Sequence, residues 1–152
     1  MQSTEPISSA LPALGILANL STDDRATLEV YGEVLFLNKG ERLIEQGQPQ
    51  AFLHFVLEGE LKIQVASKES IVTLGYAQVG GCVGEMSLIE PTTASASVVA
   101  SAHSRLWYLS HESFNRFVDD HPAAGAALLR AIALVLAGRL RKGSERLLAT
   151  GG

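Results

Sequence analysis

Cysteine is almost absent from this 152-residue sequence, which contains Cys82 alone. A single cysteine cannot form an internal disulfide, so a reducing compartment is the simpler expectation. A basic excess is also lacking, since the net charge is −4, whereas nucleic-acid-binding domains usually carry a positive footprint. We therefore expect this chain alone to have no nucleic acid partner.

Long apolar runs and a basic N-terminus are missing as well. The first twenty residues carry Glu5 and no basic residue, unlike the charged start of a signal peptide. The longest apolar run, Ala131–Ala137, is well short of the roughly 18 residues that a membrane span needs. These features predict a soluble, cytoplasmic protein with no membrane partner.

Histidine motifs for metal binding are lacking too. The sequence has four histidines and no H-x-H or H-x-x-x-H pattern, although metal enzymes need several ligands converging on one ion. The segment FVLEGEL resembles the strand and turn that follow the metal motif of cupins, but only His54 lies beside it. Cys82 has no partner histidine for nucleophilic catalysis. We expect no enzyme activity and no metal, and a cupin-type metalloenzyme is the least favoured alternative.

What is present is enough apolar sequence, 47% of residues, for the core of one domain. Leu14–Leu20 is typical of a short helix, and Ser21 is an expected N-cap of a second, which runs to about Tyr31. From residue 32 onward, short apolar runs alternate with turns at Gly40, Gly47 and Gly59. This pattern predicts about eight strands in a sandwich or barrel.

The alternation of apolar residues is clearest in two of these runs. It places Leu61, Ile63 and Val65 on one face, and Val34 and Phe36 on another.

Two helices are expected after the strands. Ser110 caps the first, which ends before Pro122, and the second runs from there to residue 148. The second helix has two apolar stripes, formed by Leu128, Ile132 and Val135 and by Leu129, Leu136 and Leu140. Because one barrel covers only one stripe, we expect a homodimer through helix 122–148. The basic residues near its end, Arg139, Arg141, Lys142 and Arg146, are interpreted as solvated charges that complement the helix dipole.

The segment 80–100, GGCVGEMSLIEPTTASASVVA, is the least typical of a plain β protein. Its three glycines leave a turn bare enough for close approach to a ligand, and Glu85 then begins a short helix that Pro91 ends. The first amides of that helix suit a phosphate. Hydroxyl groups follow at Thr92, Thr93, Ser95 and Ser97, with both serines expected on one face of a strand. A glycine-rich turn followed by an edge strand is the alternative reading.

The order GEMSLI, followed eleven residues after Gly84 by SASVVA, resembles the phosphate-binding cassette of the cyclic-nucleotide-binding domain family. The resemblance implies that Glu85 takes the ribose 2′-hydroxyl, while amides and an arginine hold the cyclic phosphate. In this sequence Ala94 stands at the arginine position, and Ser144 stands where the long helix contacts the base. The implied ligand-binding residues are Gly84, Glu85, Met86, Ser87, Ala94, Ser95, Ala96 and Ser144.

The resemblance also implies the fold: mainly β with flanking helices, as an eight-stranded β-roll (double-stranded β-helix or jelly roll) with N-terminal helices and a long C-terminal helix. It divides the single domain into an N-terminal helical segment at 1–31, the roll at 32–110 with the cassette at 80–97, and C-terminal helices at 111–152. The sequence is similar to sensors of the catabolite-activator type. We expect no DNA-reading helix-turn-helix on this chain.

Three alternatives for function follow. The first is a regulatory domain that binds a small nucleotide-type ligand, with cyclic AMP or cyclic GMP as candidates, and signals through its dimerisation helix. The second is a degenerate fold that acts as a ligand-free dimerisation or partner-docking module, because Ala94 removes the fixed positive charge. The third is a different ligand whose charge is met by Arg105, Arg130 or Arg139.

Overall fold

The structure is a computed structural model that describes residues 11–151, with side chains for residues 11–144. The helical elements are η1 (Gly15–Leu17), α1 (Thr22–Glu29), α2 (Glu85–Ile89), α3 (His111–Asp120) and α4 (Pro122–Gly151). The strands are β1 (Glu33–Leu37), β2 (Arg42–Ile44), β3 (Pro49–Gln50), β4 (Phe52–Glu58), β5 (Glu60–Ala66), β6 (Ile71–Gln78), β7 (Cys82–Val83), β8 (Thr92–Thr93), β9 (Ser97–Ala100) and β10 (Ser104–Ser110).

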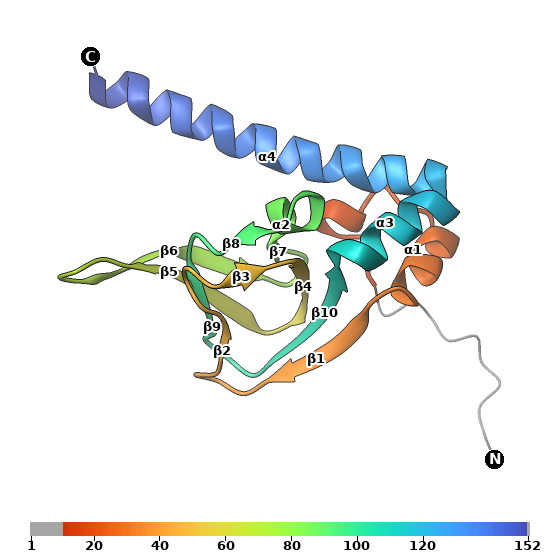
Figure 1. Ribbon diagram of the computed structural model, residues 1–152, viewed down its shortest axis with the longest axis horizontal. Coiled ribbons are helices and arrows are strands. Elements are labelled where there is room, and N and C mark those ends of the chain that lie inside the picture. Colours follow the sequence, from red (N-terminus) through yellow and green to blue (C-terminus); the bar gives the residue numbers. More distant parts are fainter. Residues whose placement is uncertain (1–10, 152) are drawn as a thin grey trace.

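The strands form two four-stranded antiparallel sheets, in the orders β1-β10-β4-β7 and β2-β9-β5-β6, and a small sheet of β3 and β8. The helices lie on one side of this roll, with α4 extending across the others (Figure 1). The expected β-roll with flanking helices is therefore confirmed. It has ten strands where about eight were expected, and three of them, β3, β7 and β8, have only two residues, too few to show a periodic pattern.

Two apolar clusters hold these layers together. Inside the roll, both sheets contribute, with Val56, Leu61 and Leu106 fully buried. The second cluster fills the space between the β1-β10-β4-β7 sheet and the helices, where Phe55 and Trp107 are buried. The Trp107 indole Nε1 also donates to the Glu29 carbonyl at 3.2 Å, which satisfies its polar atom and ties α1 to the sheet.

In β1, the alternating residues Val34 and Phe36 face solvent, and the leucines that alternate with them face the interior of the roll. Val34 and Phe36 are exposed at 41% and 71% on the outer face of the strand. Leu35 and Leu37 instead pack against the cluster inside the roll. A strand with apolar residues on both faces does not reveal from its own sequence which face is covered.

The helix ends are where the sequence indicated them. Ser21 Oγ accepts from the Asp24 amide at 3.1 Å, and Ser110 Oγ accepts from the Ser113 amide at 3.0 Å. Both serines are thus N-caps that satisfy an otherwise unpaired amide. The expected helix over Leu14–Leu20 is shorter, a 3-10 turn over Gly15–Leu17.

Helix α4 is the longest element, and its apolar surface is only partly covered. Leu128 and Ile132 of the first stripe are buried against the helical cluster, where Leu129 and Leu136 pack partly. Leu140 is 74% exposed and Leu134 60% exposed. Within the described side chains, the single chain therefore covers one face of α4 as far as Leu136 and leaves Leu134 and Leu140 in solvent.

By length and composition alone, residues Pro122–Ser144 could also cross a membrane. The longest uninterrupted apolar run is short, but the helix continues through Arg130 and Gly138, so its total length and mean hydropathy reach those of a membrane span. One such helix is weak evidence for a span, since core helices of soluble proteins have the same length and composition. Buried Leu128 and Ile132 give this helix a core role in the fold.

Candidate ligand pocket

The cassette begins where β7 meets α2, and Gly84 makes this junction possible. Its φ of 88° is in the left-handed region, and a Cβ there would lie 2.2 Å from the Phe52 carbonyl oxygen. The glycine is therefore required by the close approach of this turn to β4. A Cβ on Gly80 or Gly81 would likewise meet neighbouring protein atoms at 3.0 Å, and the expected role of the glycines in ligand approach stays a prediction.

A cavity of about 500 Å³ opens beside α2 and is within the ~300–1,000 Å³ typical of small-molecule sites. Seven of the eight residues singled out in the sequence line it: Gly84, Glu85, Met86, Ser87, Ala94, Ser95 and Ala96. The eighth, Ser144, is exposed on α4 and is not among the lining residues. Seven residues selected from the sequence pattern therefore lie on one surface of the fold. A role for Ser144 stays a prediction.

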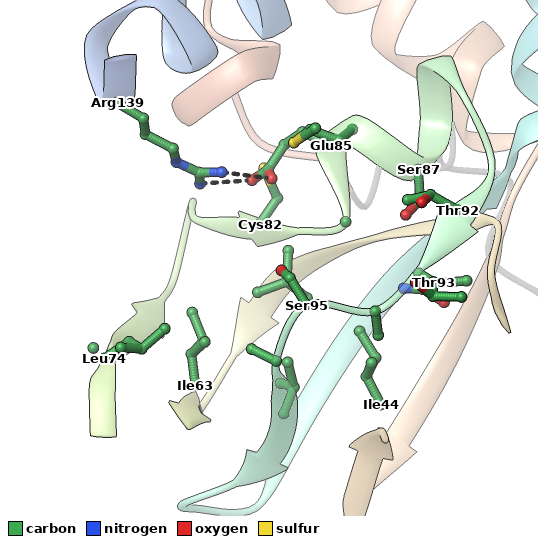
Figure 2. Close-up of a pocket in the computed structure, with 18 of the residues that line it drawn as sticks. Ile44, Ile63, Leu74, Cys82, Glu85, Ser87, Thr92, Thr93, Ser95 and Arg139 are labelled. Atoms are coloured by element: carbon green, nitrogen blue, oxygen red, sulfur yellow. Dashed lines mark hydrogen bonds and ion pairs between the residues drawn. The ribbon is translucent and has the colours of Figure 1, made fainter. Parts of the chain in front are cut away.

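The cavity has a polar side and an apolar side (Figure 2). Ile44, Ile63 and Leu74 form the apolar side, which comes from the β2-β9-β5-β6 sheet. The polar side carries the hydroxyls of Ser87, Thr92, Thr93 and Ser95. This arrangement suits a ligand with one apolar face and several hydrogen-bonding groups.

Ser97 is not part of this polar side, which corrects the expectation that it shares a strand face with Ser95. Ser95 lies in a bend before β9, whereas Ser97 is the first residue of β9 and is buried. The Ser97 hydroxyl accepts from the Gln46 amide at 2.9 Å and from Arg42 at 3.1 Å. It therefore fixes the β2–β3 connection.

Glu85 is the buried charge of the site, and its partner comes from the far end of the chain. Both carboxylate oxygens accept from the Arg139 guanidinium of α4, each at 3.0 Å (Figure 2). The Glu85 side chain is 4% exposed and that of Arg139 is 56% exposed. Such a bidentate pair is stronger than a single charged hydrogen bond and fixes both groups in one plane. It also raises the pKa of Arg139 above its ordinary value.

Cys82 is the third member of this group. Its thiol donates to Glu85 Oε1 at 3.0 Å. Burial, reinforced by the adjacent Glu85 carboxylate, raises the pKa of the Cys82 thiol far above its ordinary value. The thiol therefore stays protonated near neutral pH, where it is a hydrogen-bond donor and a poor nucleophile.

Arg139 is the functional candidate whose role the sequence did not show. Its interpretation as a solvated charge is wrong, because it lines the cavity and pairs with a buried carboxylate. Of the other two arginines proposed to meet a ligand charge, Arg105 pairs with Glu58 and Arg130 is exposed away from the cavity lining. Nothing local marks Arg139, since its partner lies 54 residues earlier.

His54, the one histidine beside the cupin-like segment FVLEGEL, is buried at 7% exposure on β4. It stacks on Tyr108 with ring centroids 5.8 Å apart, and its Nδ1 has no hydrogen-bond partner. Burial lowers its pKa from 6.5 to about 4. Across the described residues, no three His, Cys, Asp or Glu side chains are grouped closely enough to hold a metal ion.

Comparison with known proteins decides the family. The sequence profile of the cyclic nucleotide-binding domain matches residues 34–121, which is more than half of the chain. This chain belongs to the cyclic nucleotide-binding domain family. The match includes the cassette, helix α3 and all ten strands, of which β1 lacks only its first residue.

Solved structures and sequence relatives extend this result. The catabolite activator protein of Thermus thermophilus is similar over 90% of this chain and 63% of that one, with a TM-score of 0.82 and 23% identity. A cyclic nucleotide-binding domain from Methylobacillus flagellatus is similar over 86% and 74%, with a TM-score of 0.78 and 26% identity.

Glutaminase 1 of Bradyrhizobium diazoefficiens is 30% identical over 125 residues, or 82% of this chain. The regulatory subunit of cAMP-dependent protein kinase from Blastocladiella emersonii is 34% identical over 83 residues, or 54% of this chain. This chain spans about a fifth of the length of each of these two relatives.

Proposed function

We propose that this chain is a regulatory sensor domain, without catalytic activity, that binds a small nucleotide-type ligand in the cavity beside α2 and transmits occupancy through α4. The Arg139–Glu85 ion pair carries this proposal. The family resemblance assigns the Glu85 carboxylate to ligand binding, and α4 is the helix expected to form the dimer. The ion pair joins the two. A ligand hydroxyl that engages Glu85 therefore acts on a group that holds α4.

The contacts of α4 support this route. Its first half packs against α3 and η1, with Ala124, Leu128 and Ile132 buried. Beyond Leu136, the ion pair of Arg139 is the one polar link to the roll among the described side chains. Ligand-dependent changes at Glu85 thus act where the packing of α4 is weakest.

Substitution of Arg139 by Gln tests this link. Because Arg139 is more than half exposed, the pair contributes about 1 kcal/mol. Its loss should raise amide hydrogen exchange over residues 136–144 about fivefold, as measured by mass spectrometry. Arg141→Gln is the matched control, since Arg141 is exposed on the same helix and does not line the cavity. Equal exchange in both variants would show that the pair does not hold α4.

A second copy of the chain is the proposed partner of α4. Leu134 and Leu140 remain exposed, and only 22% of the most apolar part of the helix is covered. We expect light scattering to give about twice the chain mass at micromolar concentration. Leu140→Glu should shift this mass to the monomer, because it places a charge in the seam.

The control for this experiment is Val30→Glu, which adds the same charge at an 83% exposed apolar position at the C-cap of α1 and should remain dimeric. Leu129→Glu or Leu136→Glu would be less clear tests, because both leucines also pack on the helical cluster. A wild-type mass equal to one chain at every concentration contradicts the proposed dimer.

A ligand-free docking module is the second candidate, and Ala94 is the observation that favours it. Ala94 lines the cavity and also packs against the cluster inside the roll. The open volume and the polar side of the cavity favour the sensor over this alternative, because neither is needed by a scaffold. We place the sensor in the cytoplasm, with no membrane and no nucleic acid partner, on the basis of its charge and single cysteine.

A further inference from the structure

The charges that line the cavity add up to zero. Among the described residues, the lining contains one carboxylate, Glu85, and one cation, Arg139. These two neutralise each other through both carboxylate oxygens. Any charge on a ligand would therefore enter a site without a free opposite charge.

A phosphate is the group that this balance disfavours. Residue 94 supplies no cation, so an entering anion could be paired only by Arg139. If Arg139 turned to the ligand, Glu85 would lose its partner while its side chain is 4% exposed. Leaving a buried carboxylate unpaired is unfavourable, as is burying an unpaired phosphate.

Neutral hydroxyl groups, in contrast, find partners without disturbing the ion pair. A carboxylate offers about four acceptor positions, and Glu85 uses three, two for Arg139 and one for Cys82. One position is left for a ligand hydroxyl. The hydroxyls of Ser87, Thr92, Thr93 and Ser95 make no hydrogen bond within the described part of the protein, so they are available as well.

We infer that the ligand of this cavity is an uncharged ribonucleoside, with its ribose hydroxyls at Glu85 and its base on the apolar side formed by Ile44, Ile63 and Leu74. The inference rests on the proposed function, which supplies the nucleotide-like shape of the ligand. It adds that the phosphate is the part of a nucleotide that this site disfavours.

Calorimetric titration with adenosine, guanosine and the corresponding cyclic nucleotides tests the inference. The wild type should bind one of the nucleosides at least about tenfold more tightly than its cyclic phosphate, the ratio expected when one charged hydrogen bond is missing. Its 2′-deoxy analogue should bind less tightly than the ribonucleoside.

The charge balance is tested by Glu85→Gln, which leaves Arg139 unpaired and gives the lining a formal charge of +1. This variant should lose the preference for the nucleoside and gain affinity for the cyclic phosphate. Glu90→Gln is the matched control, because it removes the same charge from an exposed position outside the cavity lining and should keep the wild-type preference.

The outcomes separate the two ideas. If the wild type binds a cyclic nucleotide at least as tightly as its nucleoside, the inference is wrong and the proposed sensor function stands. If Glu85→Gln binds cyclic nucleotides and the wild type binds none of these compounds, the proposed sensor function of the wild type fails together with the inference. If no variant binds any of these compounds, the proposed function fails, and the inference fails with it.

Discussion

Acidification from about pH 7.5 to about pH 4.5 should lower the free energy of unfolding by about 2.5 kcal/mol through His54 alone. His54 is buried, and this burial lowers its pKa from 6.5 to about 4. At pH values between these two pKa values, His54 of the unfolded chain binds a proton that His54 of the folded protein does not. Because the unfolded state binds more protons there, stability rises with pH across this window and is lost as pH falls through it.

The measurement is urea unfolding of the wild type and of His54→Leu over this pH range. The leucine variant has no imidazole to titrate at this position. Its free energy of unfolding should therefore fall by about 2.5 kcal/mol less than that of the wild type over the same pH range. At neutral pH it should be near wild type, because the His54 Nδ1 has no hydrogen-bond partner to lose. His103→Gln replaces an exposed histidine and should keep the wild-type slope. A gap between wild type and His54→Leu that is constant with pH would show that His54 titrates normally.

Features that depend on a few neighbouring residues could be predicted from the sequence. The serine caps at Ser21 and Ser110 are set by one side chain and an amide three residues away. The turns at Gly40, Gly47 and Gly59 have φ values near 90°, which glycine adopts without strain. The cassette could be found for the same reason, since its residues are close in sequence and line one cavity.

Features that depend on pairing across the chain could not be predicted. The arginine that binds Glu85 is on α4, and its sequence context is that of an ordinary solvated helix residue. The exposed face of β1 and the inward turn of Ser97 depend on which strand lies next to each of them. Arg139 matters most of these, because the charge balance of the cavity depends on it.

Ala94→Arg should raise the affinity for cyclic AMP or cyclic GMP by about 10- to 150-fold. A charge-assisted hydrogen bond contributes about 1.5–3 kcal/mol, and the variant gives the cavity lining its missing unpaired cation. The backbone should keep its position, because the Ala94 amide donates to the Gln48 carbonyl at 2.9 Å and its carbonyl accepts from the Gly47 amide at 2.8 Å. Ala94→Gln is the control for size, since it adds a long polar side chain without charge.

Glu85→Ala, added to the arginine variant, should reduce the preference for cyclic AMP over its 2′-deoxy analogue, because the ribose 2′-hydroxyl loses its proposed acceptor, Glu85. The preference should fall about tenfold, while the freed Arg139 acts on the phosphate of both ligands alike. Calorimetry on the single and double variants with both ligands gives the four affinities required. An unchanged preference would place Glu85 away from the ribose. If Ala94→Arg folds normally and binds no cyclic nucleotide, the cavity is closed to such ligands for a reason other than charge, and the ligand-free docking module becomes the better account of this chain.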